Sequence, residues 1–508
     1  MSVEIELDAP FKRVAVDPGY RLEDYAQYTY LAPQLMDLEA VARKSVPQLA
    51  GRRIWMLSST SRGGGVAEGQ PRIVSLMRQL GLSVEWVTIH KPDPAFFALT
   101  KRIHNQLHGM GKPGLGRRDR ELYDGVSVRL ADALASELRP NDILIVHDPQ
   151  PLAAGALIKK KRGLPLIWRC HIGFDGKVAA SQEAWRFLMA DALACDRSIF
   201  TLRAYVPPFL SEKAAIMSPG IDPLTHKNRE LSVHKTAGIL IDAALAATMH
   251  PVLAPPFEAP ALRLQTDGSF EPAVFPQDIG LLFRPILTQI SRWDRLKGFG
   301  PLLDAFALLK RRKPQQAHDV RHQLTIDHAR LVLAGPETGG VQDDPEASET
   351  LAELCRRWRE LPPELQHEIA ILKLPLTSVK ENALMVNVLQ RCSTIVLQNS
   401  VREGFGLTVA EAMWKALPVM GGAAAGIRAQ LLDGITGRLV DNPENAEAVA
   451  DTLHAMLADD KAREVWGRNA RDRVSREFLI FTELRHWLEL LTEVVSASAS
   501  GRKVPAAE

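Results

Sequence analysis

The sequence predicts an α/β protein with two domains, each built on a parallel β-sheet that helices cover on both faces. The chain has 508 residues, more than one compact hydrophobic core usually holds. Short apolar runs of strand length alternate along it with stretches of helical periodicity, and this alternation is typical of parallel sheets. The composition, 46% hydrophobic and 24% charged, is ordinary for a soluble globular protein.

The first domain is expected over residues 1–230. It begins with a peripheral helical stretch that reaches about Ala50. Short apolar runs predict its strands at residues 53–57, 84–89, 142–146 and 166–170. A helix between the first two strands is expected to end at Gly81, because glycine favours helix C-termini.

The second domain is expected over residues 281–476, where the alternation of strands and helices starts again. Its strands are predicted at residues 285–290, 331–335 and 395–398. Residues 231–280 lose clear periodicity and are rich in proline, which indicates a linker with an inserted, partly helical segment. A last helix is predicted over 477–495, followed by a frayed tail over 496–508.

Bulk properties exclude several function classes. The net charge of +2 argues neither for a nucleic-acid surface nor for an acidic partner, and no apolar stretch approaches the ~18–20 residues of a membrane helix. The N-terminus lacks the pattern of a secretory signal. The four cysteines lie far apart without a C-x-x-C pair, and no Asp-x-Asp occurs, so nothing calls for a metal. We expect a cytoplasmic protein without nucleic-acid or membrane partners.

The first candidate site is the glycine run 63–65, which follows a predicted strand and begins a helix. Glycines there let a phosphate or a sugar approach backbone N–H groups at a helix N-terminus. The run is not G-x-G-x-x-G, so the dinucleotide-binding fingerprint is missing. A tight turn that binds nothing explains the glycines equally well.

The second candidate is the strand-end loop 291–298, which contains the cations Arg292, Arg295 and Lys297. Fixed cations stabilise the negative charge of a diphosphate leaving group without reorganising. Arginine grips phosphate oxygens with its fork, and lysine acts as a point charge. Solvated surface charge beside a turn glycine is the alternative.

The third candidate is the ten-residue string REGFGLTVAE, which contains Glu403 and Glu411. Gly404 and Gly406 would let backbone amides reach sugar hydroxyls, and Glu403 can accept hydrogen bonds from two of them. Glu411 has another interpretation, because Thr408 and Glu411 are spaced as a helix capping box. The two interpretations are compatible if the cap uses only one carboxylate oxygen.

His147, Asp148 and His171 each follow a predicted strand of the first domain. Ligands of open parallel sheets bind beyond the carboxyl ends of the strands. A histidine after a strand is more often a packing residue, but these lie in the same domain as the glycine run, which favours a functional role.

Taken together, these motifs resemble those of family-4 retaining glycosyltransferases of GT-B fold, in which two Rossmann-like domains face each other across a cleft. Within that family the chain is most similar to the trehalose glycosyltransferring synthases. Five motifs carry the resemblance: SRGGGVAE at 61–68, FFALTK at 96–101, HDPQP at 147–151, WRCH at 168–171 and VREGFGLTVAEAMWK at 401–415. The resemblance covers nearly the whole chain, although residues 235–280 are longer than the family pattern.

The resemblance implies a role for each matching residue. Catalysis would rest on Arg292, Lys297, His171 and Glu403. The donor would be bound by Gly64, Gly65, Gly404, Phe405, Gly406, Leu407, Thr408 and Glu411. The acceptor would be bound by Asp148, His147 and Gln150. The last helix would cross back onto the first domain, and closure of the two halves would form the site.

The resemblance also implies a reaction. Glucose would pass reversibly from a nucleoside-diphosphate-glucose, as co-substrate, to glucose, giving α,α-trehalose without a further cofactor. The leaving phosphate would accept the acceptor's proton, which agrees with the lack of an evident protein nucleophile. A retaining trehalose phosphorylase is the alternative, and a non-catalytic sugar or nucleotide sensor is a third. A homodimer is expected on base rates.

Overall fold

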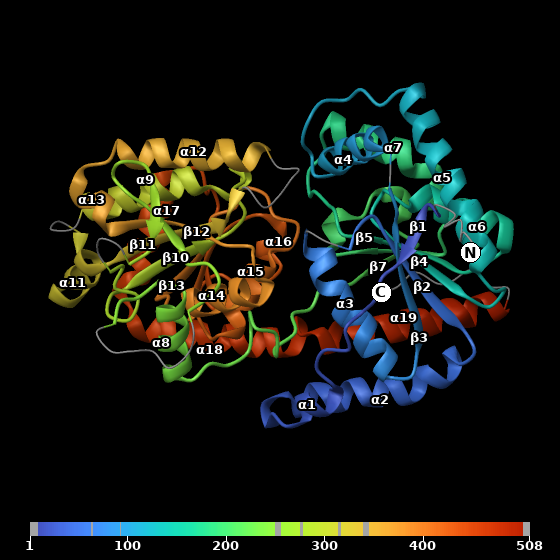
Figure 1. Cartoon of the computed structure of the whole chain (residues 1–508), viewed down its shortest axis with the longest axis horizontal. Coiled ribbons are helices and arrows are strands. Elements are labelled where there is room, and N and C mark those ends of the chain that lie inside the picture. Colours follow the sequence, from blue (N-terminus) through green and yellow to red (C-terminus); the bar gives the residue numbers. More distant parts are fainter. Residues whose placement is uncertain are drawn as a thin grey trace, which may run out of the picture. The chain divides into compact units, whose positions relative to one another are not determined.

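The computed structural model describes residues 9–61, 64–91, 93–248, 256–274, 278–312, 316–338 and 345–500. It divides into two compact units (Figure 1). The first unit combines Met1–Gly220 with Phe478–Glu508, and the second unit is Ile221–Glu477. Each unit is an α/β domain on its own largely parallel sheet, as the sequence predicts.

The first unit has a seven-stranded sheet in the order β1-β3-β2-β4-β5-β6-β7. Only the edge strand β1 is antiparallel to its neighbour among the described strands. The strands are β1 (Phe11–Arg13), β2 (Arg53–Ser58), β3 (Ser83–Ile89), β4 (Ile143–His147), β5 (Leu166–Cys170), β6 (Arg197–Phe200) and β7 (Ala214–Ile216). Every residue of β4, β5 and β6 is buried, as expected for strands that helices cover on both faces.

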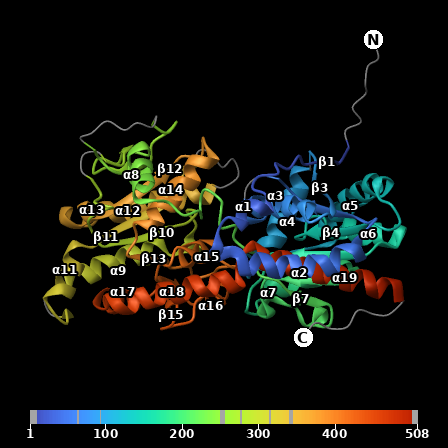
Figure 2. The same ribbon diagram turned by 90° about the horizontal axis from the view of Figure 1, so that it is seen from below.

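The helices of the first unit are α1 (Leu22–Ala26), α2 (Ala32–Leu49), α3 (Gly64–Gln79), α4 (Pro94–Leu107), α5 (Arg117–Glu137), α6 (Leu152–Arg162), α7 (Ala179–Ala194) and α19 (Ile480–Ser500). Helix α19 comes from the end of the chain and packs along α2 (Figure 2). Its Glu493 pairs with the buried Arg197 of β6. The chain therefore completes its first domain with its last helix.

The second unit has an eight-stranded sheet in the order β15-β14-β13-β10-β11-β12-β8-β9. Its strands are β8 (Leu262–Leu264), β9 (Phe270–Pro272), β10 (Ile286–Ile290), β11 (Arg330–Pro336), β12 (Ile369–Leu374), β13 (Ile395–Gln398), β14 (Val419–Gly422) and β15 (Gly437–Val440). Its helices are α8 (Val233–Asp242), α9 (Phe299–Arg311), α11 (Val320–His328), α12 (Pro345–Arg359), α13 (Pro363–Glu368), α14 (Val379–Arg391), α15 (Leu407–Trp414), α16 (Ala425–Arg428), α17 (Ala446–Ala458) and α18 (Asp460–Glu477).

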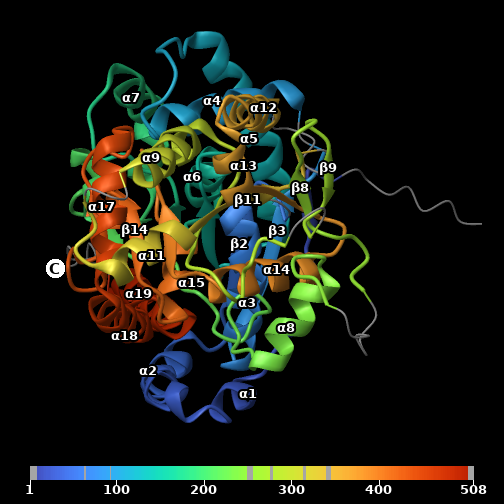
Figure 3. The same cartoon turned by 90° about the vertical axis from the view of Figure 1, so that its left-hand side faces the viewer.

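Two hydrophobic clusters fill the two faces of the second sheet. In β11, Leu331 and Leu333 belong to one cluster, and Val332 and Ala334 to the other. Successive side chains of a strand point to opposite faces, so this alternation shows that the strand is covered on both sides. Helices α9, α12 and α17 cover one face, and α8 and α14 cover the other (Figure 3).

The expected linker over residues 231–280 is instead part of the second unit. Leu240 of α8 and Ala273 lie in the core of that unit with no exposed surface, and β8 extends its sheet by pairing with β12. The units divide at Gly220, not near residue 230. The prolines of this segment indicated irregular structure. Its strands could not be predicted, because three residues are too few to show the alternation of apolar and polar side chains.

The end of the chain also differs from the expectation. Helix α18 continues through Glu477, and α19 runs from Ile480 to Ser500, so residues 496–500 are helical and not frayed. Residues 501–508 lie outside the described part of the chain. Within the described residues, none of the helices combines the length and the apolar character that crossing a membrane requires.

Candidate active site

Two loops of the second unit leave the same edge of its sheet. Strands β10 and β13 are adjacent and parallel, so the loops that follow them begin side by side. The Gln289 side chain joins the two loops: its Nε2 donates to the Lys297 carbonyl over 2.8 Å, and its Oε1 accepts from the Asn399 N–H over 2.8 Å. A buried amide thus fixes the cation loop against the loop that leads to Glu403.

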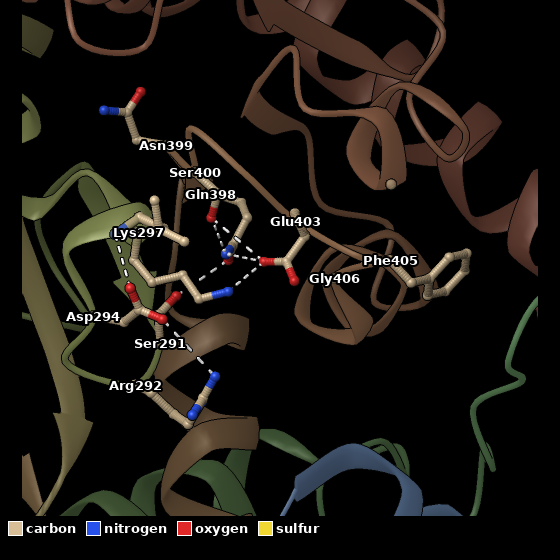
Figure 4. Close-up of polar contacts among 12 residues, drawn as sticks. Ser291, Arg292, Asp294, Lys297, Gln398, Asn399, Ser400, Glu403, Phe405 and Gly406 are labelled. Carbon is tan, nitrogen blue, oxygen red and sulfur yellow. Dashed lines mark hydrogen bonds and ion pairs between the residues drawn. The ribbon is translucent and has the colours of Figure 1, made fainter. Parts of the chain in front are cut away.

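Lys297 and Glu403 meet in an ion pair at this edge (Figure 4). Lys297 Nζ lies 2.6 Å from Glu403 Oε2, and the two side chains are 12% and 14% exposed. The same oxygen accepts hydrogen bonds from Gln398 Nε2 at 3.2 Å and from Ser400 Oγ at 3.4 Å. Three donors on one oxygen stabilise the ionised carboxylate and fix its orientation.

Gln398 and Ser400 are site residues that the sequence analysis did not identify. Gln398 Nε2 donates to Ser400 Oγ over 2.8 Å, and its Oε1 accepts from Ser291 Oγ over 3.3 Å. Both residues are buried, with 2% and 0% of their surface exposed. The sequence did contain a signal for them, because a run of polar residues directly follows an apolar strand. Polar side chains that are buried at such a place need hydrogen-bond partners.

Gly298 allows the cation loop to approach the neighbouring loop. Its φ of 65° lies in the left-handed region, and an added Cβ would stand 2.2 Å from the Asn399 carbonyl oxygen. The Asn399 side chain in turn donates to the Gly298 carbonyl over 3.2 Å. A side chain at this position would therefore displace the loop that carries Lys297.

We expect Gly298→Ala to destabilise the protein clearly more than Gly434→Ala. Gly434 has a similar φ of 71°, but an added Cβ there meets nothing within 4 Å. Left-handed backbone alone costs a non-glycine residue roughly 1–2 kcal/mol. The clash with Asn399 adds at least about 1 kcal/mol at Gly298, within the ~1–3 kcal/mol scale of local strain. Thermal unfolding of both variants tests this, and equal losses would show that the loop relaxes freely.

The string around Glu403 forms a tight turn into α15. Gly406 has a φ of 87° and is the N-cap of α15. The turn rests on Gly426, whose N–H donates to the Glu403 carbonyl over 3.2 Å, and an added Cβ there would stand 2.6 Å from the Phe405 Cα. Gln430 Nε2 also donates to the Gly406 carbonyl over 3.3 Å. These hydrogen bonds and the close packing of Gly426 thus fix the backbone from Glu403 to Gly406.

The expected capping box at Thr408 and Glu411 is wrong. Helix α15 begins at Leu407, so Thr408 lies inside its first turn, and the N-cap makes no side-chain hydrogen bond. The left-handed Gly406 starts the helix before the predicted cap. Glu411 is 7% exposed, and its Oε1 lies 3.7 Å from Lys227 Nζ. Among the predicted donor residues, Phe405 is buried, and Gly404, Leu407 and Thr408 are half-buried.

Arg292 lies in the cation loop and faces Asp294 (Figure 4). Its guanidinium is 3.9 Å from the Asp294 carboxylate, and its side chain is 68% exposed. Asp294 Oδ1 accepts from the Leu296 N–H over 2.8 Å, which shapes the short turn before Lys297. Arg292 is therefore a solvated cation at the same loop.

In the first unit, Asp148 and His171 follow the adjacent parallel strands β4 and β5. Asp148 Oδ1 accepts from the His171 backbone N–H over 2.9 Å. Asp148 has a φ of 63°, a region that few residues other than glycine adopt, and such strain is concentrated at functional sites. Burial raises the pKa of Asp148 to about 7, against the lowering effects of the His171 N–H and the Arg169 charge.

His147 and His171 form a buried pair of imidazoles. His147 Nδ1 lies 3.0 Å from His171 Nε2, and the ring planes differ by 11°. Burial lowers the pKa of His147 to about 3 and that of His171 well below its ordinary value, and the Arg169 charge adds to both effects. His147 is only 2% exposed and its Nδ1 contacts His171; its role in acceptor binding stays a prediction.

Three other predicted residues lie in the first unit. Gln150 is half-buried, and its Oε1 is buried without a hydrogen-bond partner among the described residues. Gly64 and Gly65 are the first residues of α3. Gly63, the remaining member of the glycine run, lies outside the described residues. No cluster of three His, Cys, Asp or Glu side chains that could hold a metal occurs in the part of the chain that the structure describes.

Two family models match the two halves of the chain. Residues 56–207 match the model described as trehalose synthase, N-terminal domain. Residues 282–473 match the model described as glycosyl transferases group 1.

Individual proteins agree with these matches. The trehalose synthase of Thermococcus litoralis is 34% identical over 474 residues, which cover 93% of this chain and 97% of the relative. The trehalose phosphorylase of Pleurotus pulmonarius is 28% identical over 459 residues, 86% of this chain but 56% of the relative. The solved α,α-trehalose-phosphate synthase (UDP-forming) of Burkholderia vietnamiensis superposes with a TM-score of 0.62 at 18% identity, over 90% of this chain and 100% of that one.

The structural match shows the fold, and the relative of 34% identity over nearly its whole length shows the family. The chain is a glycosyltransferase of GT-B fold that belongs to the trehalose synthase family.

Proposed function

We propose that this chain transfers glucose from a nucleoside-diphosphate-glucose to free glucose, forms α,α-trehalose, and retains the anomeric configuration of the donor. The observation that carries the proposal is the Lys297–Glu403 ion pair at the carboxyl edge of the second sheet. It places a cation suited to a diphosphate beside a carboxylate suited to sugar hydroxyls.

The two members of the ion pair have different roles in the proposed reaction. Lys297 uses one of its N–H donors on Glu403 and keeps two for phosphate oxygens. Glu403, fixed by Gln398 and Ser400, accepts from hydroxyls of the donor glucose. Arg292 supplies a second positive charge from the same loop. Lys297 and Glu403 are in place before the reaction, so Lys297 stabilises developing charge without reorganisation.

Retention follows from attack on the face that the leaving group occupies. The bond between C1 of the donor glucose and the diphosphate oxygen breaks, and a bond from the acceptor's anomeric oxygen forms on the same face. The acceptor's proton passes to the leaving phosphate oxygen. Asp148 orients the acceptor through its hydroxyls. No protein nucleophile takes part in this scheme.

A trehalose phosphorylase is the second candidate function. The relatives that carry this name match 86–87% of the chain, and a cation pair such as Arg292 and Lys297 suits free phosphate as well as a diphosphate. In that reaction phosphate would cleave trehalose to glucose 1-phosphate and glucose.

Incubation with a panel of nucleoside-diphosphate-glucoses and glucose, in buffer free of phosphate, separates the two functions. We expect a non-reducing disaccharide and release of the nucleoside diphosphate with at least one donor. Turnover that requires phosphate and ignores every nucleotide would support the phosphorylase instead. Tight nucleotide binding without turnover in either assay would indicate a non-catalytic sensor.

A further inference from the structure

We propose that His147 is a positioning residue that holds His171 in its Nδ1–H tautomer, so that His171 presents a hydrogen-bond donor to the bound sugar. The inference rests on the proposed function for the identity of that ligand. The tautomer itself follows from the contacts of the first unit alone.

The two histidines are held as a rigid pair. His147 ends β4, and His171 follows β5 directly. The Asp148 carboxylate accepts from the His171 N–H over 2.9 Å, and the Asp148 carbonyl accepts from Trp168 Nε1 over 3.0 Å. With the ring planes within 11° of parallel and a nitrogen separation of 3.0 Å, the imidazoles share one hydrogen bond. His171 Nε2 is thereby occupied, which leaves Nδ1 to meet a ligand.

Both rings of the pair are neutral. The Arg169 guanidinium, with 0% of the residue exposed, acts on both of them, and its nearest carboxylate is that of Glu483 at 3.9 Å. A further positive charge beside a buried guanidinium is unfavourable, and burial disfavours imidazolium as well. The bond between the rings therefore contains a single hydrogen, carried either by His147 Nδ1 or by His171 Nε2.

The surroundings of His147 decide which ring donates. His147 Nε2 is buried without a hydrogen-bond partner among the described residues. If His171 donated, the proton of His147 would have to sit on that nitrogen as an orphaned N–H, and buried orphaned N–H groups are rarer than unsatisfied acceptors. If His147 Nδ1 donates, its Nε2 carries only a lone pair, which the nearby Arg169 cation favours. His147 is thus the donor, and His171 carries its proton on Nδ1.

This tautomer gives His171 a defined chemical role. A neutral imidazole with its proton on Nδ1 and its Nε2 lone pair occupied has no free lone pair for the acceptor's proton. It can only donate, to a sugar hydroxyl oxygen or to an oxygen of the leaving group. The arrangement accords with a reaction in which the leaving phosphate takes the proton.

Nitrogen-15 NMR of the full chain labelled at histidine tests the tautomer without any turnover. The chemical shift of a protonated ring nitrogen differs strongly from that of an unprotonated one. The chain has 14 histidines, so the His171 signals are assigned as those lost in His171→Asn. At neutral pH we expect a protonated Nδ1 and an unprotonated Nε2 on His171. A protonated Nε2 would overturn the proposal, whether or not the chain makes trehalose.

Two variants of His147 test the positioning role in turnover. Asparagine places an N–H donor near the position of Nδ1, whereas aspartate offers only acceptors and favours the opposite tautomer. We expect His147→Asn to stay within about tenfold of the native kcat and His147→Asp to lose a further 10–100-fold, the scale for losing a group that orients a site residue. Equal losses at matched thermal stability, or a better aspartate variant, would contradict the proposal.

Discussion

Lys297→Ala is expected to lower kcat by roughly 10²–10³, the scale for removing one preorganised group that stabilises developing charge. Lys297 Nζ is held at 2.6 Å from Glu403, and its backbone carbonyl is held by Gln289. The ammonium is therefore already positioned when the bond to the diphosphate breaks. Its loss should raise the barrier more than it weakens binding, so kcat should fall more than KM rises. Steady-state kinetics with direct detection of the disaccharide measure both quantities.

Arg356→Ala is the matched control, because it also removes one cation from the second unit. Arg356 lies on α12, is 64% exposed and pairs with Glu360 over 3.0 Å. Exposed ion pairs of this kind contribute at most about 1 kcal/mol, so we expect native kinetics. A Lys297 variant that is as active as this control would mean that the diphosphate is bound elsewhere.

Glu403→Gln is expected to lower kcat/KM by roughly 10²-fold. The glutamine keeps the shape of Glu403 but removes the charge that Lys297, Gln398 and Ser400 donate to. A hydrogen bond to a charged group contributes about 1.5–3 kcal/mol, and the bonds that the sugar hydroxyls donate to the Glu403 carboxylate would become bonds to a neutral amide. The same kinetic assay measures the loss, and calorimetry of donor binding shows how much of it arises before the chemical step.

A double-mutant cycle shows whether the pair acts as a unit. If it does, the variant that combines Lys297→Ala with Glu403→Gln should lose less than the two single losses combined, because contacting residues are not additive. The same cycle on the exposed pair Arg356 and Glu360 is the control and should leave the kinetics native in all three variants. Additive losses at Lys297 and Glu403 would contradict a joint role.

The strands that carry the site were predictable from the sequence. Apolar runs predicted strands at 285–290 and 395–398, and the structure has β10 and β13 at almost the same residues. Because these strands are parallel neighbours, the cation loop and the Glu403 loop leave the same sheet edge. That adjacency depends on strand order, which a single sequence does not encode locally.

Other features depend on contacts between residues distant in sequence. The hairpin β8–β9 consists of three-residue strands whose pairing with β12 makes them part of the sheet, so no local pattern predicts them. The capping box at Thr408 and Glu411 failed because the left-handed Gly406 begins the helix earlier. The resemblance assigned His147 to acceptor binding, and only the structure shows that it ends a fully buried strand and contacts His171.

The proposed reaction is tested most directly by following one labelled carbon. The full chain is mixed with nucleoside-diphosphate-glucose labelled with carbon-13 at C1 and with unlabelled glucose, without phosphate, and NMR follows the label. We predict that the label appears in α,α-trehalose, with the α configuration at the labelled carbon, while nucleoside diphosphate accumulates. A labelled β linkage, or no labelled disaccharide with any of the common nucleotide donors, would contradict the proposal.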